Sequence, residues 1–307
     1  MTTGIKICEV SPRDGLQGEC HIPTSDFKVG MVNNLVKAGM NYVEVGSFVS
    51  PKAVPAMAQT GEVFGGLDRS LDTKFTALVL NDKGFERALA AEVDGICVVM
   101  VVSESLCQKN NGVRPAEALN RARNIIRQAK DRNLFVRLDI APAWVCPYDG
   151  PVPISMVERA VLSLAAEGVD EVALCDTIGA ASPEDVSRLI AHFLPTLGED
   201  KLAVHLHDTQ GLGLANAYAA LAAGCRIFDS SAAGLGGCPF AKGARGNLAT
   251  EDLVLLCHKL GYSTGVDLSK LHKVVGDLEV EFERSLGGGT RSFWQSLTQE
   301  KKDAFNC

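Results

Sequence analysis

The chain has 307 residues, of which 46% are hydrophobic and 22% are charged, with 30 Lys and Arg against 37 Asp and Glu. This apolar fraction is too high for a disordered chain, and no apolar run reaches the roughly 18–20 residues that a membrane span needs. A formal net charge of −7 argues against a nucleic-acid-binding protein, which usually carries a basic surface. We therefore expect a soluble globular protein with neither nucleic acid nor a membrane as its partner.

Eight short, β-rich apolar runs recur along the chain and predict strands. In chain order they are Ile5–Val10, Tyr42–Val45, Phe75–Leu80, Gly95–Val102, Leu134–Ile140, Glu171–Cys175, Leu202–His205 and Ile227–Ser230. Helical periodicity is found between them, at Phe27–Ala38, Ala116–Arg132, Ser155–Glu167, Pro183–Phe193 and Leu214–Ala223. Ser182 before Pro183 is typical of a helix start, and Gly39, Gly168 and Gly224 stand where helices end.

Strands that alternate with helices in this way predict an α/β fold, a (β/α)8 TIM barrel with one closed parallel sheet. A doubly wound open sheet is the competing interpretation. No Ser/Gly-rich tract, charge block or shift in composition divides the chain, so we expect one domain over residues 1–307. Further helices predicted at Asn247–Leu260, Leu268–Leu278 and Ser292–Phe305 would make residues 248–307 a helical C-terminal extension.

Ten cysteines are an unusual feature of the composition, and no C-x-x-C pair occurs among them. The chain is large and begins without a signal-peptide pattern, so we expect no disulfide framework and a cytoplasmic protein. Cys97, Cys175 and Cys225 lie in or beside apolar runs, where a reduced thiol behaves as a small hydrophobe. Cys238 differs, because it follows a glycine-rich stretch typical of a mobile lid, where a thiol is available for proton transfer or nucleophilic attack.

The functional residues of a parallel barrel gather at the carboxyl ends of its strands. His205 and His207 are two residues apart at such an end, so both imidazoles project to the same face. With a carboxylate from another strand they form a pattern typical of a divalent-cation site, and Asp14, after the first strand, is the best candidate. Such a ligand set suits Mg²⁺ or Mn²⁺ better than structural Zn²⁺. The alternative is a pair of core histidines beside a capping aspartate.

Arg13, next to Asp14, would place a fixed cation at the mouth of this site, where it could bind a carboxylate or stabilise a developing enolate. Glu44, in the second strand, could hold that guanidinium, and a structural Arg–Glu bridge is compatible with this role. The segment 211–216 imitates a dinucleotide fingerprint but lacks its third glycine, and no P-loop pattern occurs, so no organic cofactor is expected.

Four segments together carry a recognisable signature: Ser11–Gln17 (SPRDGLQ), Val43–Lys52 (VEVGSFVSPK), His205–Thr209 (HLHDT) and Gly234–Pro239 (GLGGCP). They resemble the 3-hydroxy-3-methylglutaryl-CoA lyase family, within the metallolyase superfamily of TIM barrels. The resemblance extends from about Ile5 to Leu278. The glycine-rich cysteine loop makes it specific for the lyase branch, whereas H-x-H alone would suit the whole superfamily.

The resemblance implies a role for each site residue. The divalent cation would be held by Asp14, His205, His207 and Asn247. The catalytic set would be Arg13, Cys238, Glu44, Asp176 and His205. In that set Arg13 would stabilise the enolate of the departing acetyl-CoA and Glu44 would orient Arg13. Cys238 would transfer a proton, and Asp176 would help to position substrate or water near the metal. The expected substrate contacts are Arg13, Gln17, Ser47, Asp139 and Lys52.

The sequence departs from the family pattern at three positions. Asp139 stands where familiar members carry a tyrosine that faces the acyl group, Gly18 replaces an asparagine, and Ala53 replaces a tryptophan. A carboxylate beside an acidic acyl group is unfavourable unless it is paired, and Arg137 on the same strand face is the expected partner. The cation and proton-transfer residues are intact, whereas part of the acyl pocket is altered.

We therefore predict a divalent-metal-dependent lyase that cleaves a 3-hydroxy-3-methylacyl-CoA thioester, by default 3-hydroxy-3-methylglutaryl-CoA, to acetyl-CoA and acetoacetate. The altered acyl pocket leaves open an (R)-citramalyl-CoA lyase or a lyase for a longer branched acyl chain. A Claisen-condensing acyltransferase and a non-catalytic metal-binding barrel are the hypotheses from other classes. The acyl-CoA polyanion would need a basic site mouth, and we expect a homodimer. The candidate basic residues are Lys52, Lys109, Lys242 and Arg245.

Overall fold

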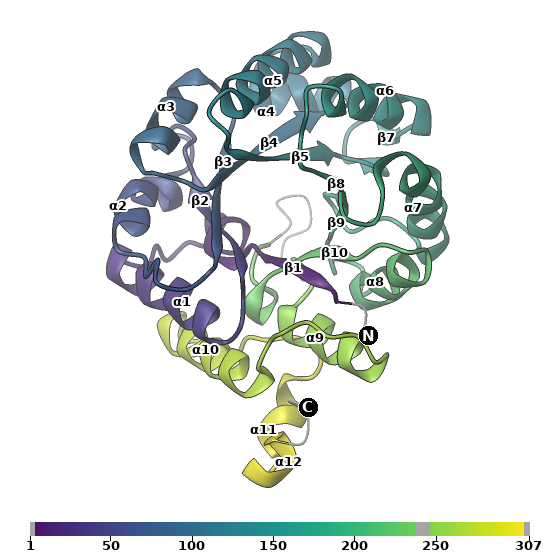
Figure 1. The fold of residues 1–307 in the computed structure, drawn as a ribbon. Helices are drawn as coiled ribbons and strands as arrows, with labels where there is room; N and C mark the ends of the chain where they lie inside the picture. The colour runs from purple at the N-terminus through teal and green to yellow at the C-terminus, as the bar shows by residue number, and fades with distance from the viewer. Residues whose placement is uncertain (1–3, 238–245, 304–307) are drawn as a thin grey trace.

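Eight parallel strands close into a barrel in the computed structural model, which describes residues 4–237 and 246–303 (Figure 1). The strands are β1 (Lys6–Glu9), β2 (Tyr42–Ser47), β3 (Lys74–Val79), β4 (Gly95–Val101), β5 (Phe135–Ala141), β8 (Glu171–Asp176), β9 (Leu202–Leu206) and β10 (Ile227–Ser230). Pairing of β1 with β10 closes the ring. The predicted TIM barrel is confirmed, and the open doubly wound sheet is wrong.

A ring of helices surrounds the barrel (Figure 1). Its members are α1 (Ser25–Lys37), α2 (Thr60–Gly65), α3 (Asp82–Ala90), α4 (Glu104–Asn111), α5 (Pro115–Lys130), α6 (Ile154–Ala165), α7 (Pro183–Leu197) and α8 (Gly213–Ala222). Helices α2, α3 and α4 were not predicted, because helices of six to nine residues are too short for a clear 3.6-residue period. A two-stranded hairpin after β5, β6 (Val145–Cys146) with β7 (Gly150–Pro151), was also not predicted.

The predicted helix boundaries follow local backbone chemistry. The Ser182 hydroxyl accepts a hydrogen bond from the Asp185 amide at 3.2 Å, and the Asp185 carboxylate accepts one from the Ser182 amide at 3.3 Å, which completes a capping box on α7. Gly39, Gly168 and Gly224 have φ values of 102°, 87° and 103°. Because side chains disfavour this left-handed region, glycine suits all three helix ends.

Four helices follow the barrel: α9 (Thr250–Lys259), α10 (Leu268–Glu281), α11 (Arg291–Ser296) and α12 (Gln299–Asp303). In Figure 1, α9 and α10 lie against one side of the ring, and α10 packs on α1. The single helix expected at 292–305 is wrong, since extended backbone at Leu297 separates α11 from α12. The helix expected from Asn247 begins only at Thr250, and Asn247 instead bridges to His207. Within the described ranges, no helix has the length and apolar character to cross a membrane.

The two faces of the barrel strands differ in chemistry. Outward-facing residues such as Val172, Leu174 and Val204 pack with the helices into the main hydrophobic core. The interior instead contains charged groups, and Arg137 is among the largest fully buried side chains of the described residues. Small inward-facing residues, which include Ala173 and Ala203, surround this region. The barrel therefore encloses a polar interior beneath the carboxyl ends of its strands.

Candidate metal centre and active site

One carboxylate and two imidazoles meet at the carboxyl end of the barrel. The Nε2 atoms of His205 and His207 lie 3.0 Å apart, and each is 3.8 Å from Oδ2 of Asp14. His205 belongs to β9 and His207 follows it, so strand alternation places both rings on the inner face, as predicted. All three residues are at least partly buried, and their ligand atoms lie close enough to hold one metal ion.

A single helical turn, η1 (Ser11–Gly15), follows β1 and brings Asp14 to the two imidazoles. The amides of Arg13, Asp14 and Gly15 all donate to the carbonyl oxygen of Val10, at 3.1, 2.8 and 3.2 Å. The chain therefore wraps tightly at the end of β1. A Cβ at Gly15 would lie 2.9 Å from Oγ of Ser231, so the close packing of this turn requires glycine.

Asn247 is the fourth predicted ligand, and it lies beside Asp14. Its Nδ2 donates to Oδ2 of Asp14 at 2.7 Å and to the carbonyl oxygen of Leu235 at 3.0 Å. Its Oδ1 is buried and has no hydrogen-bond partner among the described residues. An unsatisfied amide oxygen beside a carboxylate and two facing imidazole nitrogens matches the donor set of an oxygen- and nitrogen-binding divalent cation. The residues present therefore fit such a cation.

Asp14 and His207 are both held in the protonation forms that metals bind. Burial alone would raise the pKa of Asp14, but Arg13 and the two imidazoles hold it well below its usual range. Burial, together with the neighbouring His205, lowers the pKa of His207 to about 4. An ionised carboxylate and a neutral imidazole are the forms that a cation needs. Neither residue has to lose a proton at neutral pH before a cation binds.

Arg13 lies between two carboxylates. Its Nε donates to Oε2 of Glu44 at 2.6 Å, and its NH1 contacts Oδ1 of Asp14. Glu44 is 2% exposed and Arg13 is 8% exposed, so little water competes for these contacts. The predicted arrangement, in which Glu44 holds Arg13 beside Asp14, is therefore present. Burial would lower the pKa of Arg13, but Glu44 and Asp14 raise it, so the guanidinium stays charged.

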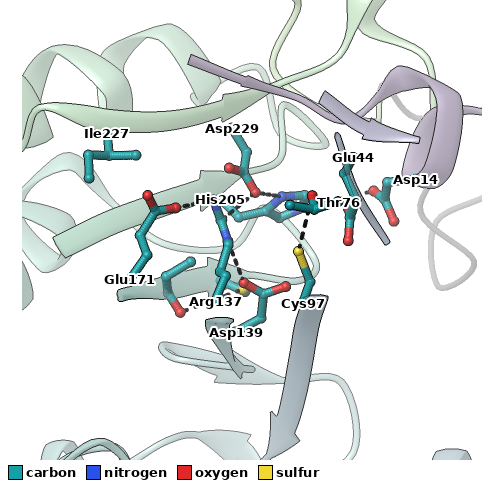
Figure 2. Close-up of polar contacts among 12 residues, drawn as sticks. Asp14, Glu44, Thr76, Cys97, Arg137, Asp139, Glu171, His205, Ile227 and Asp229 are labelled. Atoms are coloured by element: carbon teal, nitrogen blue, oxygen red, sulfur yellow. Dashed lines mark hydrogen bonds and ion pairs between the residues drawn. The ribbon is translucent and has the colours of Figure 1, made fainter. Parts of the chain in front are cut away.

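A second polar cluster fills the barrel interior beneath Asp14 and His205 (Figure 2). Nε of Arg137 donates to Asp139 at 2.7 Å, NH1 to Glu171 at 2.8 Å and NH2 to Asp229 at 2.7 Å. We call these four residues the Arg137 cluster. The pairing of Arg137 with Asp139 was expected from the sequence, whereas the contacts with Glu171 and Asp229 were missed. The sequence did offer one sign of the Asp229 contact. An aspartate inside the short, buried strand β10 needs a partner, because charged residues are seldom buried unless they are paired.

Glu44, Cys97 and Asp139 form another compact group of possible metal ligands. Two guanidinium groups already pair with its carboxylates, Arg13 with Glu44 and Arg137 with Asp139. Burial raises the pKa of the Cys97 thiol well above its usual value, which disfavours the thiolate that a metal binds. We therefore assign no cation to this group.

The other predicted site residues lie in varied surroundings. The carboxylate of Asp176 accepts hydrogen bonds from the amides of Ala180 at 3.0 Å and Ala181 at 3.2 Å, so it also shapes the loop after β8. Burial raises the pKa of Asp176 to about 6. Ser47 is buried, and its hydroxyl has no partner among the described residues. Gln17 and Lys52 are exposed to solvent.

Several predictions concern residues outside the described ranges. Cys238, Lys242 and Arg245 are among them, so their roles stay predictions. Lys109 is exposed, and its Nζ lies 4.0 Å from the centre of the Tyr148 ring. The eight cysteines in the described ranges are all free, and seven of them are buried.

Comparison with known proteins agrees with this geometry. The family model described as HMGL-like matches residues 4–277. A hydroxymethylglutaryl-CoA lyase of Pseudomonas mevalonii is 40% identical over 94% of each chain. A 3-hydroxy-3-isohexenylglutaryl-CoA/hydroxymethylglutaryl-CoA lyase of Pseudomonas aeruginosa is 43% identical over 87% of this chain and 89% of its own. The structure of an HMG-CoA lyase from Acinetobacter baumannii with coenzyme A and 3-methylmalate is 35% identical, covers 94% of each chain and superposes with a TM-score of 0.90.

Proposed function

The chain belongs to the HMGL-like family, and on this premise we propose that it is a divalent-cation-dependent lyase that cleaves a 3-hydroxy-3-methylacyl-CoA thioester. The substrate proposed first is 3-hydroxy-3-methylglutaryl-CoA, which would yield acetyl-CoA and acetoacetate. One observation carries the proposal. Asp14, next to the guanidinium of Arg13, faces both His205 and His207 at 3.8 Å, which puts a cation-binding group and a fixed positive charge side by side.

The reaction asks for both features. Cleavage removes the proton of the 3-hydroxyl group, breaks the bond between C2 and C3, and leaves the electron pair on acetyl-CoA as an enolate, which is then protonated. The other fragment leaves as a ketone. When bound, a divalent cation supplies Lewis-acid chemistry, which polarises the hydroxyl and acyl oxygens and lowers the hydroxyl pKa. We assign its binding to Asp14, His205, His207 and Asn247.

Arg13 is the proposed clamp on the enolate oxygen. Glu44 fixes its Nε at 2.6 Å, so the guanidinium is oriented before the substrate arrives. Such a preorganised donor stabilises the charge that develops in the transition state, and losing one typically costs ~10²–10³ in rate. Cys238 is the proposed acid that protonates the enolate carbon. Asp176 would help to position the substrate or water.

The acyl pocket decides which thioester is preferred, and Asp139 is its proposed determinant. Oδ1 of Asp139 accepts a hydrogen bond from Arg137, whose guanidinium also pairs with Glu171 and Asp229. This shared pairing reduces the repulsion between Asp139 and an acidic acyl group such as 3-hydroxy-3-methylglutaryl. The name of the Pseudomonas aeruginosa relative includes a longer branched acyl chain, which keeps such a substrate as an alternative. (R)-citramalyl-CoA is a second alternative, because Asp139 alters the acyl pocket. The other proposed substrate contacts are Gln17, Ser47 and Lys52.

The test is a panel of thioesters incubated with the purified protein and Mg²⁺ or Mn²⁺. Acetyl-CoA released from 3-hydroxy-3-methylglutaryl-CoA, and lost on chelation of the metal, is the expected result. Release only from citramalyl-CoA or from a longer branched thioester would reassign the substrate within the same reaction. If none of them gives acetyl-CoA with metal present, the lyase proposal is wrong. Free CoA formed from acetyl-CoA and a 2-oxo acid would indicate a condensing acyltransferase instead.

We propose that this enzyme is cytoplasmic. We also propose that the chain forms one domain and that two chains pair into a homodimer. All eight cysteines of the described ranges are free, which is typical of a reducing compartment. A sedimentation measurement on the purified protein would establish its oligomeric state.

A further inference from the structure

A chain of alternating charges crosses the barrel interior and ends at His205 (Figure 2). It begins with Nζ of Lys6 at the start of β1, which lies 2.6 Å from Oε2 of Glu171. Arg137 links Glu171, at 2.8 Å, to Oδ2 of Asp229, at 2.7 Å. The same Oδ2 lies 2.9 Å from Nδ1 of His205. The His205 imidazole thus connects this ion-pair network to Asp14 and the proposed cation site.

The contact with Asp229 determines which nitrogen of His205 carries a hydrogen. Oδ2 of Asp229 already accepts a hydrogen bond from NH2 of Arg137 at 2.7 Å, and a carboxylate in such an ion pair only accepts hydrogen bonds. Nδ1 of His205 must therefore be the donor. In the neutral ring the lone pair is then on Nε2, the atom that faces Asp14 and His207. This is the tautomer that a cation between those residues requires.

Arg137 in turn leaves Asp229 little freedom. All three of its guanidinium nitrogens donate to carboxylates, and its side chain is 1% exposed. A planar fork held at three points cannot rotate without leaving a buried charge unpaired, which is strongly unfavourable. The position of the Asp229 carboxylate is therefore fixed by Arg137.

His207 has no comparable support. Its Nδ1 is buried and has no hydrogen-bond partner among the described residues. The two imidazoles are therefore unequal, although they lie two residues apart and face the same group. His205 is held from behind by a carboxylate, and His207 is not.

We propose that Asp229 is a positioning residue that holds His205 with its hydrogen on Nδ1 and its Nε2 lone pair toward the cation, and that Arg137 acts through Asp229. The inference rests on the proposed function only in taking His205 as a ligand. A partner of this kind behind a ligating histidine commonly contributes 10–100-fold to metal affinity. Its role is thus distinct from that of Asp139 and Glu171, which pair with the same guanidinium without touching the imidazole.

The first test uses the wild-type protein and needs no variant. Protein with ¹⁵N-labelled histidine is studied without metal at a pH above the His205 titration, and the His205 signals are identified by their loss in His205→Asn. The expected spectrum shows a protonated Nδ1 and an unprotonated Nε2. A hydrogen on Nε2 in the wild-type protein would overturn the proposal.

The second test measures Mn²⁺ affinity by electron paramagnetic resonance, with thermal unfolding to establish that each variant is folded. Asp229→Ala is expected to weaken Mn²⁺ binding about 10–100-fold and to remove the preference for Nδ1–H. Asp229→Asn should weaken binding less, because its amide oxygen can accept the same two hydrogen bonds without the charge. Wild-type affinity in folded Asp229→Ala would contradict the proposal. If that variant does not fold, the tautomer measured on the wild-type protein decides, and a hydrogen on Nε2 of His205 there overturns the proposal.

Glu171→Gln is the matched control, since Glu171 contacts Arg137 but not His205. It should leave Mn²⁺ affinity near the wild-type value. A loss as large as that of Asp229→Ala would show that the network acts only through general stability, and the positioning role would be wrong. Neither readout depends on turnover. Failure to cleave any thioester would therefore contradict the proposed function while leaving this inference standing.

Discussion

Two buried histidines, one at the barrel mouth and one in the C-terminal helices, are almost equally hidden from solvent but have opposite chemistry. His205 is 7% exposed and His272, in α10, is 4% exposed. Nδ1 of His205 faces the Asp229 carboxylate, so it donates. Nδ1 of His272 faces NH1 of Arg291 at 3.4 Å, and because a guanidinium can only donate, this nitrogen accepts.

The two rings differ in pKa because their partners differ, since burial acts on both in the same direction. Burial lowers the pKa of both imidazoles. At His205 the hydrogen bond and charge of Asp229 outweigh burial and raise the pKa above its ordinary value. At His272 the positive charge of Arg291 adds to burial, and the pKa falls to about 3. His272 also stacks on Trp294, with ring centroids 4.4 Å apart, so it serves packing.

The carboxylates of the two regions follow the same division. At the mouth, Asp14 and Glu44 face guanidinium and imidazole groups that can act on a ligand. In α9, Glu251 accepts from the amides of Gly288 at 2.7 Å and Ala233 at 3.1 Å. Its neighbour Asp252 accepts from the amide of Gly289 at 2.6 Å. The carboxylates of α9 thus bind backbone amides. Substitutions of Glu251 or Asp252 are therefore expected to lower the stability of the fold more than the catalytic rate.

The largest expected effect comes from Asp14→Asn. This substitution removes the negative charge that faces the two imidazoles, so both Mn²⁺ affinity and turnover should fall. Turnover should fall on the order of 10³-fold, because a Lewis acid supplies several kcal/mol of transition-state stabilisation. The measurements are Mn²⁺ titration and steady-state cleavage of 3-hydroxy-3-methylglutaryl-CoA. Unchanged Mn²⁺ binding in the folded variant would remove Asp14 from the ligand set and weaken the contrast between the two regions.

Arg13→Met separates the clamp from the cation. Turnover is expected to fall about 10²–10³-fold, because one preorganised donor to the enolate is lost. Mn²⁺ affinity should be largely retained, since Arg13 is not a proposed ligand. The comparison of kcat with Mn²⁺ affinity in one preparation makes the distinction. A parallel loss of both would mean that Arg13 acts mainly by holding Asp14 in place.

Asp139→Tyr is expected to change preference more than rate. A phenol in place of the Arg137-paired carboxylate alters the wall proposed to face the acyl group, so the ratio of kcat/KM between two thioesters should shift about tenfold. The thioester panel described above, run on both proteins with Mn²⁺ in excess, measures this ratio. An unchanged ratio would place Asp139 among residues that only balance the charge of Arg137.

The sequence predicted those parts of the site that depend on local pattern and barrel symmetry. His205, His207, Asp14 and the Arg13–Glu44 pair were all found because parallel strands bring their carboxyl ends together. The link from Arg137 to Asp229 spans 92 positions and depends on the height of each side chain inside the barrel. Alternation along a strand indicates which residues face inward, but strand register and tilt decide which of them meet.

The smallest effect on catalysis is expected for His272→Phe, which changes the pH dependence of stability instead. Because the folded pKa of about 3 lies below the ordinary value of 6.5, the unfolded chain binds more protons between these two pH values. The free energy of unfolding should therefore rise with pH across this window, with a contribution from His272 of at most ~1.4 kcal/mol per pH unit. Phe keeps a ring on Trp294 but cannot titrate, so the slope should be shallower.

Denaturant unfolding of both proteins from pH 3 to 6.5, the two pKa values that bound the window, measures this slope. His192→Gln, at a partly exposed histidine that pairs with Glu158, is the matched control. Arg291 still donates to the backbone oxygen of residue 272 at 2.9 Å, so the helix contact survives the substitution. Turnover at neutral pH should equal that of the wild type. A steep loss of activity in folded His272→Phe would show that the C-terminal helices reach into the chemistry, and the division between the two regions would fail.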